Sequence, residues 1–451
     1  MDNNVVYVVH AIDTEGPLHE SLKATFYRLK SIFDVNLAPS KETLKKLQHK
    51  EIDLKEKEEA VANLVAPRRL EMNSTWDKLD NMLDTITSNE FRNKYPDSIG
   101  NGWIYNWFCM DHVGFNGRNP RRRDIGFHNI FDHYQEYMEL NNIARDSIQF
   151  HYHPLAPIND ANHSGTTYLN SSNIYDILTR KVIDRLWFPA AYRPGFHTER
   201  PDSNWFLEQW IPFDFANQSM DKVQNNQPDL SKARFGDWRR APISWIPYNP
   251  DLYDYQKKGS CNRYIARCLN MEARHRELQP SDVELAFEEA QQHGKSLLSF
   301  TNHDFRDMIP EINKIWNMIS NVSKQYDDVI FQHVNAVEGY RKTLDLSQKT
   351  PPDFDVEIIN DDNFSKLNVS VNHEIFGVQP FLALKTKTND YIWQNFDFES
   401  KNKWSFTFDY SNIEIKAIDK IGIAANTSTG VTEVVVLDAH TGEKKKKVLN
   451  Q

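Results

Sequence analysis

Short runs of apolar, β-branched and aromatic residues alternate with longer amphipathic stretches over the first 350 residues. Seven apolar runs have the length and composition of buried strands: residues 5–9, 103–110, 147–153, 187–192, 212–216, 297–301 and 329–333. Residues 131–140, 281–293 and 311–326 have helical spacing, and Ser281 followed by Glu284 indicates a helix start. This alternation predicts an α/β fold with a mainly parallel sheet, open or closed into a barrel.

Two regions depart from this alternation. Residues 18–98 are largely helical in pattern, with a helix-start signal at Pro39-Ser40, and are too long for a simple crossover between two strands. We expect a helical insertion there. After Thr350-Pro351-Pro352, short alternating runs separated by turn residues predict an all-β sandwich. The predicted domains are therefore 1–350, including the insertion at 18–98, and 353–451.

Composition and charge narrow the function. A net charge of −10 gives no support to nucleic-acid binding, and no stretch approaches the ~20 apolar residues of a membrane span. Residues 5–9 form an apolar run without a preceding basic region, which does not fit a signal peptide. Three cysteines make no disulfide framework or zinc-ribbon spacing. We expect a cytoplasmic protein, and the sequence does not indicate its oligomeric state.

Two acids end the first predicted strand. Asp13 and Glu15 are two residues apart and precede the turn signal Gly16-Pro17. A period of two places both carboxylates on one strand face, which opens onto the ligand crevice at the carboxyl end of a parallel strand. One acid could serve as a general base and the other as a metal ligand, although spacing alone does not assign the roles.

A histidine pair ends another predicted strand. His151 and His153, in His151-Tyr152-His153-Pro154, again share a strand face. Both imidazoles can therefore reach one ion, and two histidines with a carboxylate favour zinc among divalent metals.

Further polar residues follow other strands. In Tyr192-Arg193-Pro194-Gly195-Phe196, Arg193 could hold a carboxylate by both oxygens, although in isolation it reads as an ordinary loop arginine. His303 could protonate a leaving group, with Asp214 or Asp304 tuning its pKa. Asp111-His112 could line the substrate side of the same site.

The order of these motifs resembles the polysaccharide deacetylase superfamily (NodB-like, carbohydrate esterase family four). Ile12-Asp13-Thr14-Glu15-Gly16-Pro17 is similar to its first motif. Phe150-His151-Tyr152-His153-Pro154 is similar to the second, in the His-x-His form of branches tied to cell-surface polysaccharide synthesis (WbmS-like). The third, fourth and fifth motifs are matched by Tyr192-Arg193-Pro194, Phe213-Asp214-Phe215 and residues 298–303. The resemblance spans residues 5–345 and leaves the helical insertion and the β region outside.

The resemblance implies a distorted (β/α)7 barrel and a role for each motif residue. Asp13 is the catalytic base, Arg193 orients it, His303 is the general acid, and Asp214 is the acid of the fourth motif. Glu15, His151 and His153 bind a divalent metal, with zinc expected.

The implied activity is N-deacetylation or deformylation of an amino sugar during cell-surface polysaccharide or lipopolysaccharide synthesis. The substrate is expected to be a nucleotide- or lipid-linked glycan precursor. Two alternatives stay open: a catalytically silent carbohydrate-binding or scaffold protein on the same fold, and an amidohydrolase of non-sugar substrates.

Overall fold

The centre of the molecule is a closed barrel of seven parallel strands. The computed structural model describes residues 4–115, 121–122, 126–160, 163–165, 167–169, 171–220, 236–271, 277–361 and 364–450. Each strand pairs with the next along the chain: β1 (Asn4–Thr14), β3 (Asn106–Met110), β5 (Ser147–Tyr152), β6 (Ala191–Pro194), β7 (Phe213–Asn217), β8 (Tyr264–Asn270) and β9 (Lys295–His303). Parallel pairing of β9 with β1, from Val5 opposite Lys295 to Asp13 opposite His303, closes the ring. An eighth strand, β10 (Val329–His333), lies beside the first half of β1.

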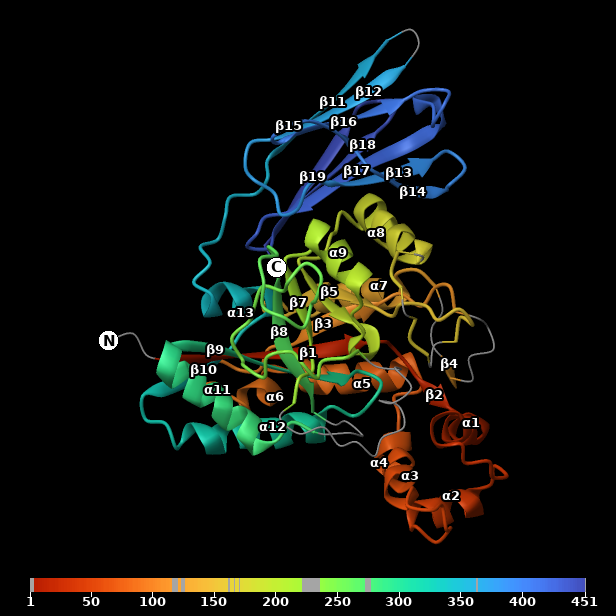
Figure 1. The fold of residues 1–451 in the computed structure, drawn as a ribbon, viewed down its shortest axis with the longest axis vertical. Helices are drawn as coiled ribbons and strands as arrows, with labels where there is room; N and C mark the ends of the chain where they lie inside the picture. The colour runs from red at the N-terminus through yellow and green to blue at the C-terminus, as the bar shows by residue number, and fades with distance from the viewer. Residues whose placement is uncertain are drawn as a thin grey trace.

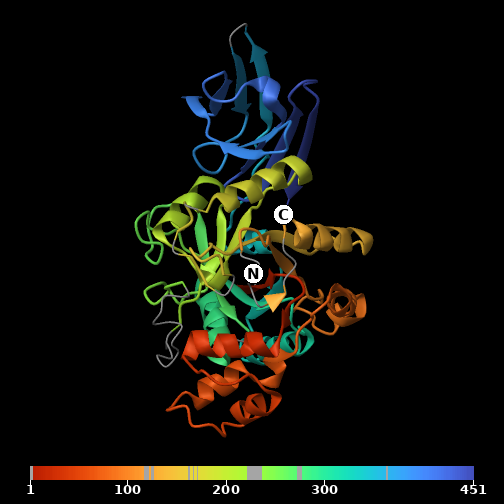
Figure 2. The ribbon, with the colours of Figure 1, turned by 90° about the vertical axis from the view of Figure 1, so that its right-hand side faces the viewer.

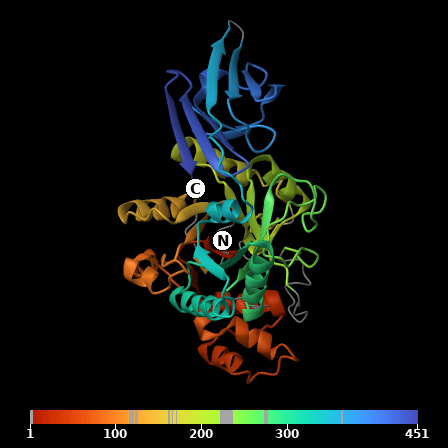
Figure 3. The same cartoon turned by 90° about the vertical axis from the view of Figure 1, so that its left-hand side faces the viewer.

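Helices cover the outside of this barrel (Figures 1 and 3). They are α7 (Asn129–Leu140), α8 (Ser172–Arg185), α9 (Pro201–Trp210), α11 (Pro280–His293), α12 (Ile309–Ser323) and α13 (Ala336–Thr343). The outward-facing Val6, Val8 and Ile12 of β1 share one apolar core with α7, α8, α9, α11 and α12. Helix α13 instead packs Ala336, Val337 and Tyr340 against the core inside the barrel. The predicted α/β architecture is therefore confirmed at the level of a closed parallel barrel with flanking helices.

Several predicted boundaries are wrong. The strand predicted at 187–192 begins only at Ala191. Helix α11 is capped by Gln279 and Asp282 rather than by Ser281, since Pro280 occupies its first turn. Strand β8 was not predicted because Arg267 interrupts its apolar run. That arginine is buried, and its guanidinium reaches the carbonyl of Ser219 at 2.9 Å and the Asp282 carboxylate at 2.9 Å.

The helical insertion divides into two parts. Its elements are β2 (His19–Glu20), α1 (Leu22–Phe33), α2 (Lys41–Gln48), α3 (Glu58–Leu64), α4 (Pro67–Leu70), α5 (Trp76–Thr87) and α6 (Asn89–Asn93). Helices α1 to α4 enclose a small core of their own, which includes Phe26, Leu29 and Val61. Leu83 of α5 and Phe91 of α6 instead join the barrel core, so these two helices form the crossover from β1 to β3. β2 pairs with β4 (Arg121–Arg122).

The C-terminal region forms two antiparallel sheets around a shared apolar core. One sheet contains β11 (Phe354–Asn360), β12 (Ser365–Val371), β16 (Lys403–Phe408) and β15 (Asp397–Ser400). The other contains β14 (Tyr391–Gln394), β13 (Phe381–Thr386), β17 (Ile418–Asn426), β18 (Val431–Asp438) and β19 (Lys444–Asn450). The lysine run at 444–447 lies in edge strand β19, where its charges oppose pairing with another sheet.

The β sheets sit directly on the barrel's helices (Figure 2). Phe381 of β13 packs against Phe188 and Trp210, with ring centroids 5.4 Å and 5.3 Å away. Trp393 of β14 stacks on Tyr175 of α8 with centroids 4.5 Å apart. These contacts are apolar, so the two regions share one continuous hydrophobic core.

Within the described part of the chain, no helix combines the length and apolar character needed to span a bilayer.

Candidate metal centre

The alternation of β1 brings its two acids to the inside of the barrel. Val5, Val9 and Ala11 face the barrel interior and pack in its inner core. Asp13 and Glu15 continue the same alternation at the carboxyl end of the strand, and both are buried, at 5% and 3% exposure. The inward-facing positions of β1 are therefore apolar inside the barrel and carry two carboxylates at its mouth.

Glu15, His151 and His153 lie close enough together to hold one metal ion. All three are buried, and one ligand atom from each lies within 4.8 Å of the others. The two Nε2 atoms are 3.0 Å apart, and Glu15 Oε1 lies 3.4 Å from that of His153 and 3.9 Å from that of His151. One carboxylate and two imidazoles form a donor set suited to zinc.

The protonation state of His151 is the one that a metal ligand requires. Its Nδ1 lies 2.8 Å from the carbonyl oxygen of Arg193, and a carbonyl can only accept, so Nδ1 carries the hydrogen. Burial lowers the pKa of His151 to about 4, although the nearby carboxylates of Asp13 and Glu15 oppose this. The neutral ring therefore points an unprotonated Nε2 at the site, an orientation fixed from behind as metal-ligating histidines require.

Arg193 holds Asp13 by both carboxylate oxygens. Its Nε donates to Oδ1, and its Nη2 donates to Oδ2 at 3.2 Å. A third donor, Nη1, binds the carbonyl of Phe215 at 2.9 Å, which fixes the guanidinium plane. Burial alone would raise the pKa of Asp13, but Arg193 and the neighbouring histidines lower it below its usual value. Asp13 is therefore ionised at neutral pH and fixed in place.

His303 completes the inward-facing cluster at the end of β9. Its Nε2 lies 3.7 Å from Asp13 Oδ2 and 3.9 Å from Glu15 Oε1. Burial lowers its pKa to about 4, against the two carboxylates that favour the charged form. The side chain keeps 29% exposure, more than Asp13 or Glu15, so it forms the solvent-facing edge of the cluster.

Asp304 supports the backbone of the first motif and does not tune His303. Its Oδ1 accepts the N–H of Glu15 at 2.9 Å, and its Oδ2 accepts the N–H of Gly16 and the hydroxyl of Tyr134, both at 2.9 Å. Burial raises its pKa to about 7, against these donors. Gly16 has a φ of +70°, which only glycine adopts without strain. The predicted tuning role is replaced by a structural one.

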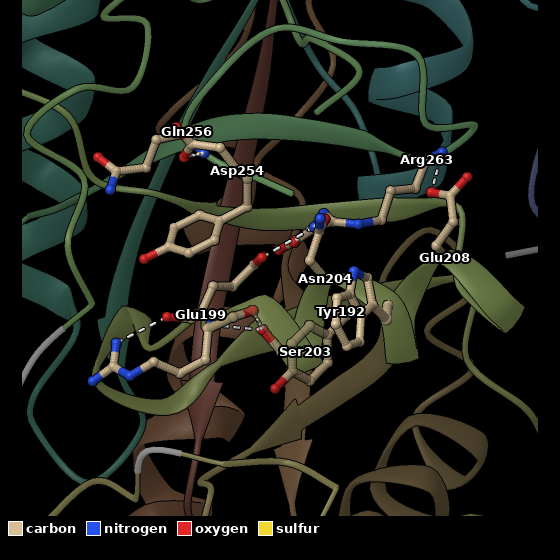
Figure 4. A network of polar contacts seen from close by, with 12 residues as sticks. Tyr192, Glu199, Ser203, Asn204, Glu208, Asp254, Gln256 and Arg263 are labelled. Atoms are coloured by element: carbon tan, nitrogen blue, oxygen red, sulfur yellow. Dashed lines mark hydrogen bonds and ion pairs between the residues drawn. The ribbon is translucent and has the colours of Figure 1, made fainter. Parts of the chain in front are cut away.

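Asp214 lies outside the barrel wall, away from His303. Phe213 and Phe215 fill the barrel interior, so the residue between them faces outward. Its carboxyl group meets Arg263 at 2.8 Å, and Arg263 also binds Glu199 at 3.0 Å (Figure 4). Burial and the neighbouring Glu199 raise the pKa of Asp214 well above its usual value. The expected contact with the general acid is not formed.

Asp111 and His112 lie on opposite sides of the barrel wall, and only one of them is near the site. Asp111 faces outward, where it pairs with the buried Lys181 at 3.0 Å and with His128 at 2.9 Å. His112 lies beside the site, with its Nε2 at 3.2 Å from the carbonyl oxygen of Glu15. Of this pair, only His112 contacts the first motif.

Phe196 and His197 were not predicted as site residues. The Phe196 ring lies 5.0 Å from that of His153, and both ring nitrogens of His197 lie 3.3 Å from Arg193 Nη2. A single histidine carries no spacing signal. Gly195 in the Arg-Pro-Gly sequence was the only available indication of a close approach.

Neither a scan against protein-family models nor a search of curated proteins finds a match for the chain.

Proposed function

We propose that the chain is a zinc-dependent hydrolase that removes an acetyl or formyl group from the nitrogen of an amino sugar, on a NodB-like barrel. One observation carries this proposal. The ion-paired Asp13, the Glu15–His151–His153 triad and His303 converge on the inner face of one barrel mouth. A metal triad, a fixed carboxylate and a more exposed imidazole are the components that metal-assisted amide hydrolysis requires.

Each residue has a distinct task in this reaction. A bound divalent ion would polarise the amide carbonyl and lower the pKa of water. Glu15, His151 and His153 would hold that ion. Asp13, kept ionised by Arg193, takes a proton from the attacking water as the C–O bond forms. His303 is neutral in the free protein. The proton that Asp13 takes from water therefore passes to the His303 imidazole, whose Nε2 lies 3.7 Å from Asp13 Oδ2, and His303 delivers it to the amine nitrogen as the C–N bond breaks, which yields a free amine and a carboxylate. Its greater exposure suits contact with the leaving group.

The substrate assignment rests on the resemblance of the motif order to surface-polysaccharide deacetylases. We propose a nucleotide- or lipid-linked amino sugar, used in cell-surface polysaccharide or lipopolysaccharide synthesis, as the substrate. A cytoplasmic site of action is supported by Cys109, Cys261 and Cys268, which are all buried free thiols.

Metal analysis and turnover test the proposal together. The full chain, purified without chelator, should contain about one zinc per molecule. It should release acetate or formate from a nucleotide-linked N-acyl amino sugar, lose this activity to a chelator, and regain it with added zinc. A protein that binds no metal and turns over no acyl amino sugar would contradict the proposal and support the silent carbohydrate-binding or scaffold protein.

A further inference from the structure

A strained turn lies directly behind the metal centre. The short helical turn Gly195–His197 connects β6 to α9, and both Phe196 and His197 adopt left-handed backbone conformations, with φ of 53° and 50°. Such conformations are unfavourable for non-glycine residues and persist only where the surroundings enforce them. Two in succession indicate a turn whose shape is imposed by its neighbours.

Contacts on the outer side of the turn impose that shape. Three consecutive carbonyl oxygens accept hydrogen bonds from distant donors: that of Phe196 from the Gly236 N–H at 3.0 Å, that of His197 from Trp238 Nε1 at 2.8 Å, and that of Thr198 from the Tyr168 hydroxyl at 2.8 Å.

The next residue, Glu199, is anchored through its side chain. Its carboxylate pairs with Arg263, which also binds Asn204 (Figure 4). Arg263 binds Asp214 as well. All four of these residues are fully or almost fully buried. The outward-facing Asp214 thus belongs to the anchor of the turn.

The inner side of the turn contacts one metal ligand, His153, and the arginine that holds Asp13. A Cβ atom on Gly195 would lie 2.2 Å from Cδ2 of His153, so the imidazole packs directly on the glycine backbone. The Phe196 ring meets the same imidazole edge to face, with an interplanar angle of 73°. His197 contacts Arg193, which holds Asp13.

His153 needs such support more than His151 does. The Nδ1 of His151 is fixed by a backbone carbonyl, whereas the Nδ1 of His153 is buried and meets no hydrogen-bond partner in the described part of the chain. Its ring orientation must therefore come from packing, and the packing partners are Gly195 and Phe196.

We propose that the Gly195–Glu199 turn is a rigid positioning element, in which Gly195 and Phe196 aim His153 at the ion and His197 braces Arg193 against Asp13. The inference rests on the proposed metal centre. It predicts that changes in this turn alter metal binding although none of its residues is a ligand.

The test is the zinc affinity of the full chain, measured by competition with a chromophoric chelator. Gly195→Ala and Phe196→Ala should each weaken binding by about 10–100-fold, the range seen when partners behind a ligand are lost. The matched control is Gly422→Ala in β17, where a new Cβ would lie 2.6 Å from Val182 Cγ1, far along the chain from the site. This control should stay within about twofold of wild type, since distant sites rarely couple.

Cobalt substitution adds a readout that loss of stability alone does not change. The visible spectrum of Co²⁺ reports ligand number and symmetry, so it should change in Phe196→Ala and remain as in wild type in Gly422→Ala. Wild-type zinc affinity and cobalt spectra in both turn variants would overturn the inference. If Gly195→Ala does not fold, Phe196→Ala decides alone. A wild-type chain that binds no metal would instead contradict the proposed function.

Discussion

Replacing Asp304 by Asn should loosen the end of β1 without touching a ligand. Asp304 accepts the N–H groups of Glu15 and Gly16 and the Tyr134 hydroxyl, all at 2.9 Å. Hydrogen bonds to a charged acceptor contribute about 1.5–3 kcal/mol each, and an orphaned buried donor costs about 1–3 kcal/mol. The Asn oxygen can keep one of the two backbone N–H groups, but its amide nitrogen then faces the other N–H, because Glu15 and Gly16 donate to different carboxylate oxygens. We expect a loss of about 2–4 kcal/mol in the free energy of unfolding.

The assay is urea unfolding of the metal-free protein at pH 8, where Asp304, with its pKa raised to about 7, is ionised. Tyr134→Phe is the matched control, because it removes one donor from the same carboxylate, leaves no donor orphaned and should cost only about 1.5 kcal/mol, the low end for a bond to a charged acceptor. Zinc affinity should fall in Asp304→Asn, since Glu15 loses its backbone support, and should change little in Tyr134→Phe. Equal stability and equal zinc affinity in the two variants would show that Asp304 does not hold the end of β1.

Two further predictions concern the outside of the barrel. Truncation after residue 352 should lower the thermal stability and solubility of the remaining chain, because Phe188 and Trp210 lose Phe381 and become exposed; an unchanged melting temperature would contradict this. Asp214→Asn should change the pH dependence of stability. The raised pKa of Asp214 in the folded state means that its contribution is full below pH ~4 and declines as pH rises, so the variant should lose less stability than wild type between pH 5 and 8 in denaturant titrations.

The convergence of the two acids and the two histidines could be predicted from the sequence because strand alternation is a short-range rule, whereas the choice of Glu15 rather than Asp13 as a ligand came from the motif resemblance. Asp13 and Glu15 share a face for the same reason as Val9 and Ala11, and His151 and His153 follow the same period on β5. Parallel strands that end at one barrel mouth then bring these pairs together. Nothing about long-range packing was needed beyond the expectation of a parallel sheet.

Strand alternation also predicts that Asp214 lies on the outer face of the barrel wall. Two phenylalanines flank it, and in a barrel with an apolar filling they take the inner positions. The resemblance of Phe213-Asp214-Phe215 to an acidic motif predicts a site role for the acid, whereas the two flanking phenylalanines predict that the acid faces outward. Glu199 and Arg263 could not be foreseen as its partners, because they are 15 and 49 residues away along the chain (214 − 199 and 263 − 214) and no spacing rule connects them.

The support that Asp304 gives to the backbone of the first motif, and the strained turn at Phe196, could not be predicted from the sequence either. Hydrogen bonds that a carboxylate accepts from backbone N–H groups 289 and 288 residues away leave no local pattern. Left-handed backbone at Phe196 and His197 runs against the preference of both residue types, so propensity would exclude it. Such local conflicts with propensity occur where tertiary contacts, and often function, impose the conformation.

Metal content and turnover of Asp13→Asn and Glu15→Ala separate the roles of the two acids, of which Glu15 is proposed to hold the metal and Asp13 to take the proton. Asp13→Asn keeps the shape of the side chain but cannot accept a proton. We expect it to retain zinc and to lose about 10²–10⁴-fold in turnover. Glu15→Ala should lose zinc and activity together, because two histidines alone hold the ion poorly. Loss of zinc from Asp13→Asn with retention in Glu15→Ala would reverse the two roles, and an active Asp13→Asn protein would contradict the mechanism.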